Sequence, residues 1–174
     1  MLQKGFGLLE IIVCLALAGL LMLFAGASFG ELLQSTRRLD TAQRLASGIR
    51  NARTEAVLRQ QRTLIHGLND DWSQGWRIIL DISGEGARDP DNPVLLERHA
   101  DRRIAVVGNR PVQHFVRFSS QGDPLLPSGA FQAGTLHICA AGPGASEHQV
   151  VLSRSGRVSL RSDKAAQALC DREG

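Results

Sequence analysis

Motifs for catalysis and for metal binding are missing from this sequence. The five histidines are scattered, and none stands in a His-Glu-x-x-His or Cys-x-x-Cys pattern. Gly84-Glu-Gly86 and Gly142-Pro-Gly144 lack the strand and helix that flank a phosphate-binding loop, so we interpret them as turns. The stretch Asp89-Pro-Asp91-Asn92 offers oxygen ligands to calcium, but isolated acidic stretches are usually turns. We therefore expect neither an enzyme nor a cofactor.

Proline is absent before Pro90, so one helix can run unbroken through two different segments. Residues 11–29 are apolar, and about twenty such residues suffice for one membrane span. Further on, apolar residues recur at three- and four-residue steps: Leu39, Ala42, Leu45 or Ala46, Ile49, Ala52 and Ala56. The pattern predicts a membrane helix over 6–30 that continues as a one-sided helix over 31–62, with Gly48 as a weak point.

One carboxylate interrupts the apolar segment. Glu10 is the only charged residue between Lys4 and Glu31. An unpaired acid at membrane depth costs roughly 2.5–3.5 kcal/mol on insertion scales, so we expect Glu10 to have a partner. Gly5 precedes the apolar run, whereas an ordinary secretory signal is cleaved after that run. Cleavage between Gly5 and Phe6 would remove the leader 1–5 and keep the helix.

Lys4-Gly5-Phe6, followed by Glu10 and an apolar run, resembles the type IV prepilin signal. The resemblance implies that a prepilin peptidase cleaves after Gly5 and that the amino group of Phe6 is methylated. It also implies that Glu10 meets the amine of Phe6 on a neighbouring subunit during assembly. A carboxylate and an ammonium neutralise each other in lipid, where neither is tolerated alone. A plain signal anchor with a chance glutamate is the alternative.

The sequence after residue 62 changes to short strands and turns. Strands are predicted at 63–66, 76–82, 94–98, 104–107, 112–119, 135–139, 148–153 and 157–160. A turn is predicted at 69–71, and the last two strands form a hairpin across Arg154-Ser-Gly156. One long helix followed by antiparallel strands makes the fold class α+β, with a head over 63–174. We expect the last fourteen residues to be weakly ordered unless Cys170 holds them.

Four motifs follow one another along the head: Asp71-Trp72-Ser-Gln-Gly75-Trp76, Asp81, Val116-Arg-Phe118 with Gly122, and Ser155-Gly156-Arg157-Val158. Together they resemble the H-type pseudopilin and minor-pilin family. The resemblance implies a pilin-like fold, with the long helix packed on antiparallel sheet and the motifs marking its start, its middle and its closing hairpin. Both tryptophans are interpreted as core residues without a catalytic role.

The three cysteines fall into two groups. Cys14 lies in the apolar run and is expected to be a free thiol. Cys139 and Cys170 form an even pair in the oxidising compartment that export implies, and we predict a disulfide between them. This disulfide would attach the polar tail to a strand. Two unpaired small apolar side chains are the alternative.

Cations gather in two places. Seven arginines between Arg37 and Arg62 are interpreted as a solvated helix face, with contact to an acidic partner as the alternative. Near the C-terminus, DNA-capturing minor pilins carry Gly-Arg-x-Arg, whereas here Ser159 replaces the second arginine. Clustered cations attract phosphates without reading sequence. Nucleic-acid contact is one interpretation, and a solvated or subunit-facing surface is the other, for Arg154, Arg157, Arg161 and Lys164.

The sequence therefore predicts a structural and assembly protein. Our first interpretation is a minor type IV pilin that helps to initiate or cap the pilus in twitching motility, adhesion or DNA uptake. The expected partners are the prepilin peptidase, the inner membrane, and other minor and major pilin subunits. We expect a single-pass inner-membrane protein with a periplasmic head that is later assembled into the filament. The alternatives are an H-type pseudopilin of a type II secretion system and a DNA-binding receptor pilin with weak DNA binding.

Overall fold

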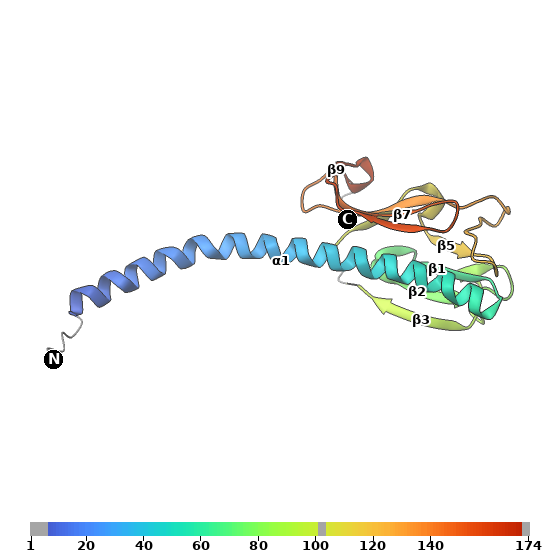
Figure 1. Ribbon diagram of the computed structural model, residues 1–174, viewed down its shortest axis with the longest axis horizontal. Helices are drawn as coiled ribbons and strands as arrows, with labels where there is room; N and C mark the ends of the chain where they lie inside the picture. The colour runs from blue at the N-terminus through green and yellow to red at the C-terminus, as the bar shows by residue number, and fades with distance from the viewer. Residues whose placement is uncertain (1–6, 101–103, 172–174) are drawn as a thin grey trace. The chain divides into compact units, whose positions relative to one another are not determined.

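The computed structural model describes residues 7–100 and 104–171, with the side chains of residues 20–29 left out of the description. The chain divides into two compact units, Met1–Arg37 and Arg38–Gly174. One helix, α1 (Leu8–Arg59), contributes to both units (Figure 1). In the described residues, the first unit is the beginning of α1, and the second unit contains the rest of α1 and all the strands.

Two antiparallel sheets form the second unit. The first sheet has the order β3-β2-β1-β5, with β1 (Thr63–Leu68), β2 (Asp71–Leu80), β3 (Val94–His99) and β5 (Phe115–Phe118). The second has the order β4-β6-β7-β8, with β4 (Val106–Gly108), β6 (Gly134–Cys139), β7 (Ala145–Leu152) and β8 (Val158–Arg161). A short strand β9 (Ala165–Ala166) also pairs with β7. Three 3-10 helices are η1 (Gly86–Arg88), η2 (Arg110–Val112) and η3 (Ala168–Asp171). The predicted α+β class is confirmed.

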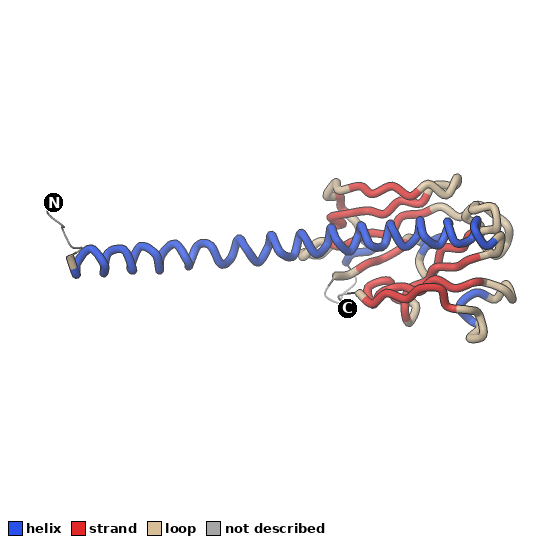
Figure 2. Tube along the Cα trace, turned by 60° about the horizontal axis from the view of Figure 1, so that its bottom comes forward, coloured by secondary structure: helices blue, strands red, loops and turns tan. Residues whose placement is uncertain are grey.

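The predicted apolar stripe of α1 is the face that packs on both sheets (Figure 2). Leu39, at the start of the stripe, is only half-buried. The other members are at most 3% exposed, and both Leu45 and Ala46 are buried: Ala42, Leu45, Ala46, Ile49, Ala52 and Ala56. The core contains Ile65 and Ile78 from the first sheet and Ile138 and Val150 from the second. Burying one such aliphatic side chain stabilises the fold by about 1.5–3 kcal/mol. The stripe therefore holds the two sheets together.

Gly48, the weak point in the helix pattern, is where the ring of Trp76 packs on α1. A Cβ atom at residue 48 would lie 2.6 Å from Cζ2 of Trp76. Glycine costs about 1 kcal/mol relative to alanine inside a helix. Because 2.6 Å is far below van der Waals contact, ring packing outweighs helix propensity at this position. Trp76 and Trp72 are 8% and 3% exposed, which confirms that both are core residues.

The helix ends at Arg59 rather than at the predicted residue 62. Gln60 adopts a left-handed φ of 50°, and the N–H of Gln61 donates to the carbonyl of Ala56 at 3.2 Å. The N–H of Gln60 donates to the carbonyl of Val57 at 3.3 Å. These are the two bonds of a Schellman motif, which usually has glycine at the left-handed position. A glutamine gives no such signal, so the sequence pattern missed the helix end. The predicted start at residue 6 lies outside the described residues.

Strand β2 covers Asp71–Leu80, whereas the sequence predicted 76–82. Asn69 and Asp70 both have left-handed φ values, 52° and 61°, as in a two-residue type I′ hairpin turn. Asp71 therefore already pairs with Leu68, and the predicted turn at 69–71 is one residue shorter. Ile82 lies beyond the strand and is 58% exposed.

Other predicted strands also differ in their bounds; 148–153 forms as Ala145–Leu152 and 157–160 as Val158–Arg161. The strand at 112–119 forms only over Phe115–Phe118, because the segment before it, with Pro111 at its start, folds as η2. The strand at 104–107 is shifted to Val106–Gly108. The closing hairpin is confirmed, with Leu152 of β7 opposite Val158 of β8. The described part of the tail includes β9 and η3.

Candidate functional site

Glu10 lies in the first turn of α1, where its carboxylate caps the helix. Its Oε2 accepts the N–H of Gly7 at 3.3 Å, one of the N–H groups that a helix start leaves unpaired. Negative charge near a helix N-terminus is also favoured by the helix dipole. The predicted processing residues Gly5 and Phe6 lie outside the described residues. Glu10 is thus exposed and already directed toward the backbone that precedes the helix.

The described side chains around Glu10 are apolar and exposed. Leu8, Leu9 and Ile12 are 78%, 76% and 58% exposed. Exposed apolar surface on this scale marks a contact with another protein or with a membrane. The predicted free thiol of Cys14 is confirmed, and it is exposed. A search of the described residues finds no helix whose length and apolarity would allow it to span a membrane.

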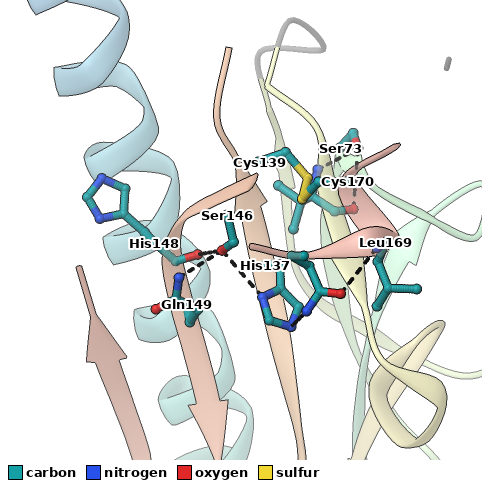
Figure 3. Close-up of a disulfide and its surroundings, with 10 residues drawn as sticks. Ser73, His137, Cys139, Ser146, His148, Gln149, Leu169 and Cys170 are labelled. Atoms are coloured by element: carbon teal, nitrogen blue, oxygen red, sulfur yellow. Dashed lines mark hydrogen bonds between the residues drawn. A yellow bond between two sulfur atoms is a disulfide. The ribbon is translucent and has the colours of Figure 1, made fainter. Parts of the chain in front are cut away.

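The disulfide Cys139–Cys170 is confirmed, with a Cα–Cα distance of 5.6 Å and a sequence separation of 31 (Figure 3). It joins the end of β6 to η3. The tail is also attached by β9, whose Ala165 pairs with Ser146. Next to this strand, the N–H of Gln167 donates to the carbonyl of Gly144 at 2.8 Å. A covalent bond and backbone pairing therefore both fix the tail to the second sheet.

The predicted nucleic-acid residues are all exposed: Arg154, Arg157, Arg161 and Lys164. Arg154 lies in the β7–β8 turn, Arg157 directly precedes β8, and Arg161 ends it. Arg161 is four positions after Arg157, a distance of about 13 Å at roughly 3.3 Å per residue. Lys164 directly precedes β9. This strand pairs with β7 on the same side as β8 does, further along β7. The four cations form a line along one sheet edge, which we call the basic edge.

Two arginines of α1 donate hydrogen bonds to the backbone at the start of the basic edge. The sequence pattern did not predict this role for them. Arg53 donates from Nε to the carbonyl of Gly122 at 2.9 Å and from Nη1 to that of Gly156 at 3.4 Å. Arg50 donates from Nη2 to the carbonyl of Val158 at 3.1 Å. Gly122 and Gly156 have left-handed φ values of 84° and 73°. A Cβ atom on either glycine would lie within 3.0–3.2 Å of Arg53 Nε, so both motif glycines allow this close approach.

Arg53→Ala is expected to lower the free energy of unfolding by about 1.5–3 kcal/mol, the usual range for hydrogen bonds to a charged group. The loss arises because two turn carbonyls, those of Gly122 and Gly156, lose their donor. Urea unfolding of the full chain in detergent micelles measures the change. Arg59→Ala is the matched control, because Arg59 makes only an exposed helix pair with Glu55, worth less than about 1 kcal/mol. Equal effects of the two substitutions would contradict the prediction.

Asp81, a motif residue that directly follows β2, is fully buried and forms an ion pair with Arg117. Its Oδ1 accepts the N–H of Gly86 at 2.9 Å, and its Oδ2 lies 3.7 Å from Nη1 of Arg117. The side chain of Arg117 is 11% exposed. The N–H of Asp81 donates to the carbonyl of Arg62 at 2.9 Å. Asp81 therefore fixes the loop after β2 to β5 and to the residue before β1, which is a structural role.

The stretch considered for calcium is organised by its own hydrogen bonds. Asn92 accepts the N–H of Ile82 at 3.0 Å and donates to the carbonyl of Gly86 at 2.9 Å. Hydrogen bonds from Ser83 and from the backbone of Asp91 lower the pKa of Asp89. In the described ranges, no group of three or more His, Cys, Asp or Glu side chains is placed to hold a metal ion. The arrangement is that of a hydrogen-bonded turn.

Two solved structures share the fold of this chain. The crystal structure of the type IV minor pilin FimU from Pseudomonas aeruginosa strain PAO1, in space group P21, has a TM-score of 0.61 and 21% sequence identity. It covers 79% of this chain and 98% of the FimU chain. A second crystal form, in space group P65, gives a TM-score of 0.58 and 21% identity over 75% of this chain and 98% of that one. Among curated proteins, no sequence matches the chain.

The family comparison covers most of the second unit. Residues 41–156 match the family described as type II transport protein GspH. The match begins in the one-sided part of α1, includes the motif residues from Asp71 to Gly122, and ends at Gly156 in the closing hairpin. With the pilin-like fold established independently by the FimU structures, the chain belongs to the type II transport protein GspH family.

Proposed function

We propose that this chain is a minor pilin of a type IV pilus, a structural subunit near the filament tip that helps to start assembly. The observation that carries the proposal is Glu10, the only charged residue between Lys4 and Glu31, in the first turn of α1. The exposed apolar side chains on either side of Glu10 support the proposal. So does the likeness of the fold to a solved minor pilin.

In this proposal, a prepilin peptidase removes residues 1–5, and residues 6–30 anchor the chain in the inner membrane before they enter the filament core. Residues 31–62 connect this segment to a periplasmic head over 63–174. Glu10 then exchanges one partner for another, from the N–H of Gly7 to the methylated amine of Phe6 on a neighbouring subunit. A charge-assisted bond between carboxylate and ammonium is stronger than a bond to a neutral N–H, so the exchange favours assembly.

Glu10→Val is expected to reach the membrane as well as the wild type and to enter filaments on the order of tenfold less, because an assembled subunit loses a charged hydrogen bond worth about 1.5–3 kcal/mol. The measurement compares the amount of chain in the membrane fraction with that in sheared filaments. Glu31→Val is the matched control, since Glu31 is an exposed carboxylate on the same helix. Normal incorporation of Glu10→Val would show that Glu10 is not the docking group.

The same filament fraction tests the processing step. Mass spectrometry of the assembled chain should find N-methylated Phe6 at the N-terminus. Intact Met1 on assembled chain would rule out the proposed role.

An H-type pseudopilin of a type II secretion system is the second candidate function, and the description of the matching family favours it. The same head and the same Glu10 docking would serve a secretion filament. A deletion strain separates the two machines. Loss of surface pili with normal protein secretion supports the pilus, and loss of secretion with normal pili supports the secretion system. The genes next to this one provide an independent indication.

DNA contact is the third candidate, favoured by the line of exposed cations on the basic edge. Because Ser159 stands where DNA-capturing pilins carry arginine, we expect no duplex binding by the full chain at about 0.15 M salt, where non-specific Kd values reach roughly 10⁻⁴–10⁻⁶ M. Fluorescence anisotropy with a labelled duplex measures this. The expectation would be contradicted if the full chain binds the duplex and if Arg157→Ala lowers the slope of log K against log salt concentration by about 0.9. Arg44→Ala is the control, because Arg44 is exposed and paired with Asp40 on α1.

A further inference from the structure

A polar cluster beside the disulfide joins the C-terminal tail to the second sheet (Figure 3). At its centre is Ser146, which is fully buried. The hydroxyl of Ser146 donates to the carbonyl of His148 at 3.0 Å and accepts from Nε2 of Gln149 at 2.8 Å. Nδ1 of His137 lies 3.3 Å from the same hydroxyl. On the other side of the ring, Nε2 of His137 lies 3.0 Å from Nε2 of Gln167 in the tail.

The hydrogen-bonding capacity of Ser146 determines which ring nitrogen of His137 carries the proton. A hydroxyl has one proton and two acceptor sites. The proton is directed to the carbonyl of His148, and one acceptor site is taken by Gln149. The remaining site only accepts, so Nδ1 of His137 must donate. In the neutral ring, Nε2 is then an acceptor.

Gln167 is oriented to fill that acceptor. Its Oε1 accepts the N–H of Leu169 at 3.1 Å, which directs its Nε2 toward the ring of His137. Every polar atom of the contact is therefore paired when the imidazole is neutral. A proton added at Nε2 would face the NH₂ group of Gln167, donor against donor. Turning the amide over would place that NH₂ group against the N–H of Leu169, so one hydrogen bond is lost in either orientation.

We propose that His137 makes the attachment of the C-terminal tail sensitive to pH. The neutral ring holds Gln167 in place. Protonation at Nε2 breaks this contact and loosens β9 and η3, while the disulfide to Cys139 keeps Cys170 attached.

The charged groups around the cluster do not govern this titration, which depends on the imidazole ring of His137. Glu147 on β7 is bound by Arg38 of α1 at 2.8 Å. Asp171 in η3 lies against Gly144, and the exposed Asp163 and Lys164 precede β9. No ion pair joins His137 to a carboxylate in the part of the chain that the structure describes, and burial lowers the pKa of His137.

His148, a second histidine nearby, lies on β7 and is separate from this contact. Nδ1 of His148 lies 3.1 Å from the hydroxyl of Ser162, and Nε2 lies 3.9 Å from Oε1 of Glu147. The burial of His148 lowers its pKa, while Glu147 raises it and Arg38 lowers it further. Only the backbone carbonyl of His148 contacts the hydroxyl of Ser146.

The direction of the pH effect follows from the lowered pKa. An unfolded histidine titrates near 6.5, so the unfolded chain binds this proton more readily than the folded chain. The contact is therefore fully present above about pH 6.5 and is lost as the pH falls through the lower folded pKa.

Amide hydrogen exchange of the full chain in detergent micelles, with the disulfide intact, tests the proposal. The reporters are the N–H groups of Gln167 and Cys170, which donate to the carbonyls of Gly144 and Gln167. Relative to pH 7.5, we expect their protection, corrected for intrinsic exchange, to fall on the order of tenfold at pH 5, as for one lost hydrogen bond. Amides of β1 should change much less, and the disulfide should stay intact by mass spectrometry.

Gln167→Glu gives the sharpest comparison, because a carboxylate accepts from a protonated ring. In this variant, tail protection should rise as the pH falls, the reverse of the wild type. His66→Gln is the control, since burial also lowers the pKa of His66 but that residue lies on β1, and it should show the wild-type tail response. The ¹⁵N shifts of the wild-type imidazole should show the Nδ1–H form at pH 7.5. An Nε2–H form, or the same pH response in Gln167→Glu as in wild type, would overturn the proposal.

Discussion

Reduction of the Cys139–Cys170 disulfide is expected to lower the free energy of unfolding by about 3–4 kcal/mol. The bond closes a loop with a sequence separation of 31, and opening this loop restores chain entropy to the unfolded state. Urea unfolding of the full chain in detergent micelles, with and without reductant, measures the change. The fluorescence of Trp72 and Trp76 reports unfolding, because both rings are buried.

Two variants control for the chemistry of the reductant. The double substitution Cys139→Ala and Cys170→Ala should shift the unfolding midpoint as reduction does, without any reductant present. Cys14→Ser should leave the midpoint unchanged, because Cys14 is a free thiol outside the second unit. A midpoint that is unchanged by both reduction and the double substitution would show that the disulfide adds nothing to the stability of the head.

Asp81→Ala is expected to lower the free energy of unfolding by about 3–5 kcal/mol, as for removal of one partner from a buried ion pair. The substitution leaves the guanidinium of Arg117 with 11% exposure and without its carboxylate, and it leaves the N–H of Gly86 without its acceptor. The same urea titration measures the loss. Asp81→Asn should lose less, because the amide oxygen can still accept the N–H of Gly86.

The matched control for Asp81→Ala is Asp40→Ala. Asp40 pairs with Arg44 at 2.8 Å, but the side chain of Asp40 is 51% exposed and that of Arg44 is 71% exposed. Exposed pairs of this kind contribute only about 0.2–1 kcal/mol. If the two alanine substitutions lower the free energy of unfolding equally, burial of the Asp81–Arg117 pair does not determine how much the pair contributes to stability.

The sequence predicted the structure correctly where residues follow a regular pattern. The three- and four-residue spacing of apolar residues located the buried face of α1, including Ala42 and Ile49. Alternation and turn residues located the closing hairpin at Gly156. The even pair of cysteines in a head that was expected to be exported located the disulfide between Cys139 and Cys170.

The end of α1 and the start of β2 were missed for different reasons. Gln60 ends α1 in a left-handed conformation usually left to glycine. The early start of β2 depends on the paired left-handed φ values of Asn69 and Asp70. Asn and Asp favour this conformation, so the turn itself was predicted, but the strand was expected to begin only at Trp76.

The contacts of the candidate site were missed for a related reason. Arg53 looks like any other member of a basic helix face, and only the fold brings it to the carbonyls of Gly122 and Gly156. The roles of His137 and Gln167 depend on a proton count around one buried hydroxyl, that of Ser146. Arg53 and Gly156, and likewise His137 and Gln167, are 30 or more positions apart in sequence, so no local spacing predicts these contacts.

The way in which Arg53 holds the closing hairpin has a consequence for how this surface can change. In the described residues, the hydrogen bonds of its guanidinium to the turns go to main-chain carbonyls. The position of the turn is therefore independent of the residues displayed at Arg154 and Arg157, provided that Gly156 is kept. Evolution or an engineer can exchange these displayed side chains for new recognition residues while the support beneath them stays in place.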